Sequence, residues 1–194
     1  MEATSTPRFV RALRAIHEQK RGRTELEGAE AGFTLIELMV VLLIMAILLA
    51  IAIPTFLGVK SGAYDRSTQS NLTNALTSAK AGYANGGSYA TTPTLEAAVL
   101  TSAEPNLNFL TVAPTTAGGN SVVVGVSTDG QELILVGWSQ SGTCWAAEDN
   151  EGVVTGAITG ADTAQGDFYE HWTYSSTTLC NVANISTAGW GTHY

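Results

Sequence analysis

The sequence predicts an α+β fold in which a long N-terminal helix, with a membrane-spanning first half, precedes a small antiparallel β-sheet head. Three observations predict it. An unbroken apolar run fills residues 38–53, apolar residues recur at helical spacing in residues 59–83, and two β-branched runs at residues 121–127 and 132–139 flank an Asp-Gly pair. A run of that length suits a bilayer, the spacing indicates a helix, and Asp-Gly between apolar runs indicates a hairpin.

Composition and charge exclude one class of partner. The chain has 194 residues, of which 13% are charged, and its formal net charge is −8. Binding to a nucleic-acid backbone requires clustered Lys and Arg, so we expect no nucleic-acid partner. The basic residues that exist lie mostly before Gly32: Arg8, Arg11, Arg14, Lys20, Arg21 and Arg23.

The apolar segment fixes the expected orientation. As a helix, residues 33–53 would span about 32 Å, enough for a hydrocarbon core of about 30 Å. Because basic residues are concentrated before the segment, we expect the N-terminus to stay in the cytoplasm and the rest to be exported. The alternative is a secretory signal peptide cut near Ser61-Gly62-Ala63. Its n-region would be unusually long, and Glu37 would lie inside its apolar part.

Glu37 is the one ionisable residue in that segment. A carboxylate near the middle of a membrane helix costs about 2.5–3.5 kcal/mol, and less near the interface. No basic residue lies within the stretch, so the sequence predicts a partner charge from elsewhere. Cutting the chain before Phe33 would create one, a free α-amino group.

The residues Gly32-Phe33-Thr34-Leu35-Ile36-Glu37, followed by the apolar run and Pro54, resemble the N-terminal motif of type IV pilins and type II secretion pseudopilins. The resemblance covers about residues 32–58. It implies that a prepilin peptidase cuts between Gly32 and Phe33 and then N-methylates Phe33. It also implies that Glu37 and Pro54 serve assembly.

The resemblance divides the chain into a leader peptide at residues 1–32, an N-terminal helix at 33–85 with its transmembrane half at 33–57, and a globular β-rich head at 86–194. Pro54 lacks a backbone donor, so we expect the helix to bend or loosen at residues 50–54. Gly82 and Asn85-Gly86-Gly87 are expected to end it. The resemblance implies that its second half packs on the head through Leu72, Ala75, Leu76, Ala79 and Tyr83, with Arg66, Gln69, Asn74 and Lys80 on the polar face.

In the head we expect a short helix at residues 95–100 with Thr94 as its N-cap, then the hairpin, a strand at 143–147 and a further short strand at 152–155. The polar residues 148–151 indicate a solvated turn. The tail from Asp162 has turn-forming residues, exposed-looking aromatic residues and weak periodicity, and no element is assigned there.

Cys144 and Cys180 are the only cysteines. Both fall in the exported part, so an oxidising compartment and an even count favour one disulfide. A C-terminal disulfide is also similar to what many type IV pilins contain.

The sequence offers little for catalysis. It contains no nucleophile elbow, zincin, P-loop or paired-cysteine zinc motif. Glu170 and His171 are adjacent, and neighbouring residues in a strand point to opposite faces, so we expect a surface or packing role for His171. We expect no enzyme activity, no cofactor and no metal.

The resemblance therefore implies a structural subunit of a type IV pilus. Its partners would be copies of itself in a helical filament, the prepilin peptidase, the inner-membrane pilus assembly machinery and, before assembly, membrane lipid. The precursor would lie in the inner membrane and the mature subunit in a surface filament. Two alternatives stay open: a pseudopilin of a type II secretion system, and a membrane-tethered binding domain with an uncut anchor.

Overall fold

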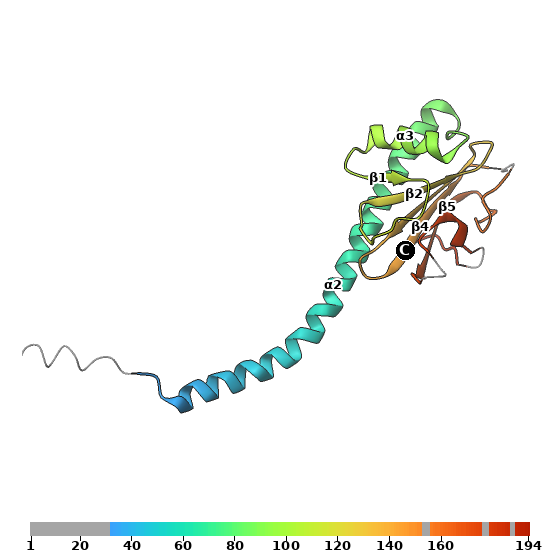
Figure 1. Cartoon of the computed structure of the whole chain (residues 1–194). Coiled ribbons are helices and arrows are strands. Elements are labelled where there is room, and N and C mark those ends of the chain that lie inside the picture. Colours follow the sequence, from blue (N-terminus) through green and yellow to red (C-terminus); the bar gives the residue numbers. More distant parts are fainter. Residues whose placement is uncertain (1–31, 153–155, 176–178, 187–188) are drawn as a thin grey trace, which may run out of the picture. The chain divides into compact units, whose positions relative to one another are not determined.

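The computed structural model describes residues 32–152, 156–175, 179–186 and 189–194. The expected leader at 1–32 therefore lies outside the described residues except for Gly32, and so does most of the short strand expected at 152–155. The chain divides into two compact units, Met1–Ile53 and Pro54–Tyr194, and each is considered by itself. The second unit contains the sheet (Figure 1).

Helix α2 runs from Leu35 to Gly86. Its backbone stays helical through Pro54, and the bend expected there stays a prediction. It also continues through Gly82, and it ends where the sequence predicts. Gly87 adopts a φ of 74°, and its amide donates to the Tyr83 carbonyl at 2.6 Å. A residue without a Cβ takes that left-handed conformation readily, so the Asn-Gly-Gly cluster stops the helix.

Within the described residues, five strands form one sheet in the order β1-β2-β3-β4-β5. They are β1 (Asn108–Leu110), β2 (Ser121–Val126), β3 (Glu132–Trp138), β4 (Thr143–Asn150) and β5 (Gly166–Thr173). Strands β2 to β5 pair antiparallel, and β1 pairs parallel with β2. The expected α+β class and the β2–β3 hairpin are confirmed, with Gly130 at a φ of 70° in its turn.

Two expectations for the head are wrong, the turn at residues 148–151 and the N-cap at Thr94, and one strand is not assigned from the sequence. Residues 148–150 continue β4 and are buried because their side chains find partners on other elements. The tail contains β5, which pairs with β4 along its whole length. Helix α3 (Pro93–Ala103) begins earlier than expected, and Thr92, not Thr94, is its N-cap. The reason is Pro93, which has no amide hydrogen and is favoured in the first helical turn.

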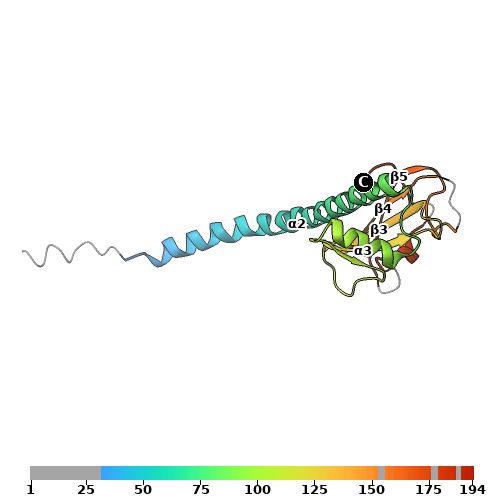
Figure 2. The ribbon, with the colours of Figure 1, turned by 90° about the horizontal axis from the view of Figure 1, so that it is seen from above.

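The two faces of the sheet bury separate cores. Against one face pack Leu72, Ala75, Leu76 and Ala79 of α2 together with α3, which confirms the apolar face expected of the helix. Figure 2 shows this part of α2 alongside the strands. The opposite face is covered by irregular chain and the short 3₁₀ helix η1 (Val182–Asn184). Its core contains Val123, Ile134, Val136, Cys144, Ala146, Ala161, Cys180 and Ile185.

Candidate functional site

The first turn of α2 is held by Thr34 and Glu37. The Glu37 amide donates to Thr34 Oγ1 at 3.2 Å, and the Thr34 amide donates to Glu37 Oε2 at 2.9 Å. The Thr34 hydroxyl donates to the same Oε2 at 2.8 Å. This is a capping box, in which the residue before the helix and the third helical residue satisfy each other's free amides.

The capping box adds a neutral partner for Glu37 within its own stretch, the side chain and amide of Thr34. The signal was present in the sequence: Thr-x-x-Glu before an apolar run is the pattern of a capping box. A capping box offers hydrogen bonds to the carboxylate but no positive charge. The hydrogen bonds of the capping box therefore stabilise Glu37 in the first turn of the helix. They do not neutralise its negative charge.

Gly32 and Phe33 precede this turn in irregular backbone and are exposed. A Cβ built on Gly32 would meet nothing within 4 Å, and Phe33 is 88% exposed. The peptide bond between them is therefore outside the helix and open to another protein. A protease requires access of this kind, since a bond within a helix has its backbone groups engaged.

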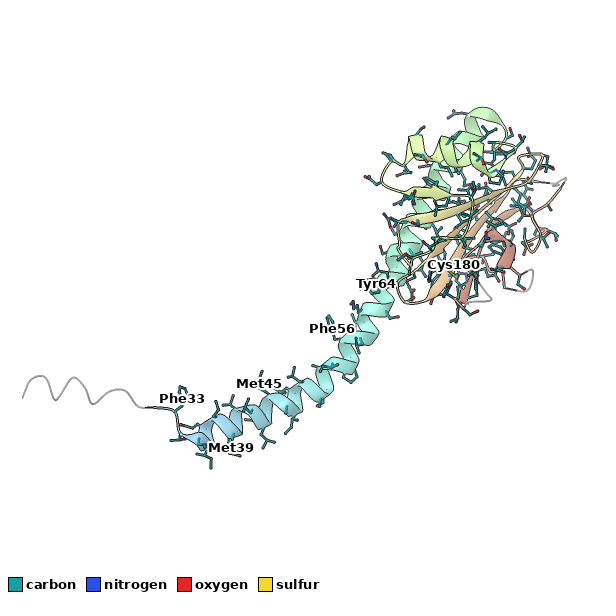
Figure 3. All side chains as sticks on the ribbon, viewed as in Figure 1. Phe33, Met39, Met45, Phe56, Tyr64 and Cys180 are labelled. Atoms are coloured by element: carbon teal, nitrogen blue, oxygen red, sulfur yellow. A yellow bond between two sulfur atoms is a disulfide. The ribbon has the colours of Figure 1, made fainter. Side chains whose placement is uncertain are left out.

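The apolar residues after the capping box face outward. Leu35 is 75% exposed, and Val40, the most covered of the large apolar side chains from Leu35 to Val59, is still 48% exposed. Figure 3 shows Met39 and Met45 projecting from the ribbon. Among the described residues, α2 is the one helix long and apolar enough to cross a membrane. An apolar surface of this extent requires lipid or other protein to cover it.

In the head, Cys144 of β4 and Cys180 form a disulfide, which is the pairing that the sequence predicts. Both cysteines are buried. The bond joins the sheet to the chain that follows β5, so it secures the covering layer of the second core.

Lys80 connects α2 to two strands. Its Nζ lies 2.6 Å from Asp167 Oδ1 and 3.1 Å from Asp149 Oδ1, and the Tyr89 hydroxyl donates to Asp149. Burial raises the pKa of Asp149 to about 6, although Tyr89 and Lys80 act against that. Burial would also raise the pKa of Asp167, but the hydrogen bonds from Asp149 and Lys80 bring it below its ordinary value. The sequence pattern places Lys80 on the polar face of α2 and does not reveal these partners, because they are distant in the chain.

Glu170 and His171 do not form a catalytic pair. Glu170 is buried and its Oε2 accepts the Ser186 amide at 3.2 Å. His171 lies on the other face, where its ring stacks on Trp145 with centroids 4.9 Å apart. The described residues include no group of three or more His, Cys, Asp or Glu that could hold a metal ion.

A family model described as the prokaryotic N-terminal methylation motif matches residues 28–53. The chain carries this methylation motif. The match includes the exposed Gly32–Phe33 bond, the capping box and most of the apolar helix. No curated protein and no solved structure matches the chain.

The methylation motif is the leader motif of type IV pilins and pseudopilins. It supports a pilin-like or pseudopilin protein that is made as a membrane-anchored precursor. The chain from Pro54 onward, which includes the second half of α2 and the head, lies outside the match.

Proposed function

We propose that this chain is a structural subunit of a type IV pilus, which polymerises into a surface filament after its leader is removed. The observation that carries the proposal is the methylation motif at residues 28–53 on a helix whose apolar side chains are exposed from Leu35 to Val59. The motif supplies a processing signal, and the helix supplies a surface that must be covered.

The first step is processing. A prepilin peptidase cuts between Gly32 and Phe33 and methylates the new α-amino group of Phe33. The precursor lies in the inner membrane with its N-terminus in the cytoplasm, where lipid covers the apolar helix. The capping box lies one residue beyond the cut, so removing the leader leaves the first turn of α2 intact.

The second step is transfer into a polymer by the inner-membrane assembly machinery. A bundle of like helices replaces lipid around residues 33–57, so the apolar side chains stay out of water. Head-to-tail contacts that do not close produce a filament and not a ring. In this bundle Glu37 pairs with the α-amino group of Phe33 on a neighbouring subunit. Screening is weak in such surroundings, so the pair is stronger there than at a surface.

The test compares wild type with Gly32→Val in the cell that makes the protein. Gly58→Val is the matched control, because a Cβ at either glycine meets nothing within 4 Å and neither change disturbs packing. The measurements are mass spectrometry of the mature N-terminus and the amount of subunit in filaments sheared from cells. We expect wild type and Gly58→Val to begin at a methylated Phe33 and to enter filaments, and Gly32→Val to stay uncut in the membrane.

Three results would contradict the proposal. A mature chain that starts near Tyr64 would indicate an ordinary signal peptide. An uncut wild-type chain in the membrane would indicate a tethered domain. A pseudopilin would be indicated if the chain is processed correctly but deletion of its gene leaves filaments normal and stops protein secretion.

A further inference from the structure

Three buried glutamates lie on the face of the sheet that α2 does not cover. They are Glu132 on β3, Glu148 on β4 and Glu170 on β5, and they are 0%, 0% and 6% exposed. The register places them on the face of Ile134 and Ala146, since Glu148 is opposite Ile134 and Glu170 is opposite Ala146. We call the irregular chain over this face the cover segments, residues 156–165 and 179–186.

Each glutamate binds a backbone amide of a cover segment. Glu132 Oε2 accepts from Ile158 at 2.9 Å, and Glu148 Oε2 accepts from Asp162 at 2.9 Å. Glu170 Oε2 accepts from Ser186 at 3.2 Å. Two carboxyl groups thus hold the first cover segment, and the third holds the second segment, which the Cys144–Cys180 disulfide also secures.

Glu132 and Glu148 differ from Glu170 in the hydrogen bonding of their second carboxyl oxygen, Oε1. Within the described part of the chain, Oε1 of Glu132 and Oε1 of Glu148 are buried side-chain atoms with no hydrogen-bond partner. The two residues are diagonal neighbours on adjacent strands, because Glu132 is opposite Asn150 and Glu148 is opposite Ile134. Two ionised carboxylates in this position would be buried side by side with one backbone amide each and no positive charge beside them, which is unfavourable.

The charged groups around this pair are acidic. Three carboxyl groups lie near Glu148: Glu132 on β3, Asp162 in the first cover segment and, diagonally, Glu170 on β5. The negative charge of Asp129, in the hairpin turn, raises the pKa of Glu132. Asp149, the next residue of β4, adds a further negative charge. The cation Lys80 binds Asp149 and Asp167, and His171 stacks on Trp145. Both lie on the opposite face.

Burial in these acidic surroundings raises the pKa of Glu148 to about 8, although the Asp162 amide opposes the shift. Burial also raises the pKa of Glu132. A neutral Glu148 still accepts the Asp162 amide through Oε2, so the protonated pair keeps both contacts to the cover segment.

We propose that Glu132 and Glu148 form a pH-sensitive latch that holds residues 156–165 on the sheet when one of them is protonated and releases this segment when both are ionised. In the alkaline step Glu148 loses its proton to solvent, and the two carboxylates then repel each other and turn toward water. The amides of Ile158 and Asp162 lose their acceptors. A cavity of about 620 Å³, lined in part by Asn150, Ile158 and Asp162, gives this segment room to move. The disulfide keeps the second cover segment in place.

Hydrogen exchange of the full chain in detergent micelles tests the latch. The amides of Ile158 and Asp162 are followed from pH 6 to pH 9, after correction for the intrinsic pH dependence of exchange, with Leu135 and Val136 of β3 as the internal reference. As the pH rises toward the pKa of Glu148, we expect the protection of the Ile158 and Asp162 amides to fall on the order of tenfold for each pH unit. Above that pKa the protection should level off. The β3 amides should stay protected.

Glu148→Gln is the decisive variant, because its side-chain carbonyl can accept the Asp162 amide but cannot ionise. We expect it to keep residues 158 and 162 protected at pH 9. Glu170→Gln is the matched control, the same change on the same face, and it should keep the wild-type fall. If Glu148→Gln does not fold, Glu132→Gln replaces it, since removing the other charge also prevents repulsion. Equal protection of wild type at pH 6 and pH 9 would overturn the latch, as would a fall in the Gln variants equal to that in wild type.

Discussion

Thr34 and Glu37 satisfy each other's backbone amides at the start of α2, at 2.9 and 3.2 Å. This relationship gives Glu37 two separable properties, a cap for the helix and a negative charge. A glutamine at this position keeps the cap, because the capping box accepts Glu or Gln, but it loses the charge.

The first prediction uses this separation. Glu37→Gln and Glu37→Val should both be inserted and cut, because each makes the helix less polar. Both should fail to enter filaments, because a buried α-amino group would lack its counter-charge, and breaking a buried pair costs about 3–5 kcal/mol. The measurement is the ratio of membrane-retained to filament-incorporated subunit. Normal assembly of Glu37→Gln with failure of Glu37→Val would show that Glu37 acts as a cap and not as a charge.

The second prediction concerns a close approach of α2 to the sheet at Gly137. A Cβ on Gly137 of β3 would lie 2.7 Å from Thr68 Cγ2, so Gly137→Ala should destabilise the head by about 1–3 kcal/mol through overpacking. Adding Thr68→Ser removes that methyl group and keeps the hydroxyl that donates to the Tyr64 carbonyl, so it should restore most of the loss. Thermal unfolding followed by tryptophan fluorescence checks this, with Gly58→Ala as the control, because it adds the same methyl group where nothing lies within 4 Å. A double variant no better than Gly137→Ala would contradict the packing argument.

The third prediction concerns the disulfide. Replacing Cys144 and Cys180 together by alanine should lower the stability of the head by about 2–4 kcal/mol, since the bond restricts the unfolded chain over a sequence separation of 36 residues. Alanine is preferred to serine because both positions are buried and a hydroxyl would need a partner. A reductant should bring wild type to the melting temperature of the variant and leave the variant unchanged. Free alkylation of both thiols in native protein would refute the pairing.

The fourth prediction is that the head is more stable in mild acid than in mild alkali. Burial raises the pKa values of Glu132, Glu148, Asp149 and Glu170, so the folded state binds more protons than the unfolded state above pH 4.5. Stability must then fall as the pH rises through the folded pKa values, about 6 for Asp149 and about 8 for Glu148. Asp167 has the opposite sign, and its contribution is lost only below its ordinary pKa of 3.8.

We expect the melting temperature of the full chain in micelles to be higher at pH 5 than at pH 8 by at least about 4 °C. Glu148→Gln should reduce this difference, and Glu96→Gln on helix α3 serves as the control. A melting temperature that rises from pH 5 to pH 8 would contradict the direction of these shifts.

The sequence by itself determined the features that depend on local pattern. The apolar run and the glycine cluster defined α2 to within a few residues, because helix continuation and termination are properties of neighbouring residues. The Asp-Gly pair defined the hairpin for the same reason. The Gly-Phe-Thr-Leu-Ile-Glu residues predicted the methylation motif that the family model matches, without any knowledge of the head.

Only the tertiary structure decided where polar residues are buried. Glu148, Asp149 and Asn150 have the composition of a turn, yet they end a buried strand. Asp149 is satisfied by Lys80 and Tyr89, and Oε2 of Glu148 accepts the amide of Asp162. Strand β5 was missed because its pairing with β4, and not its own periodicity, makes it a strand. Such compensation comes from residues far away in the chain, so local propensity cannot reveal it.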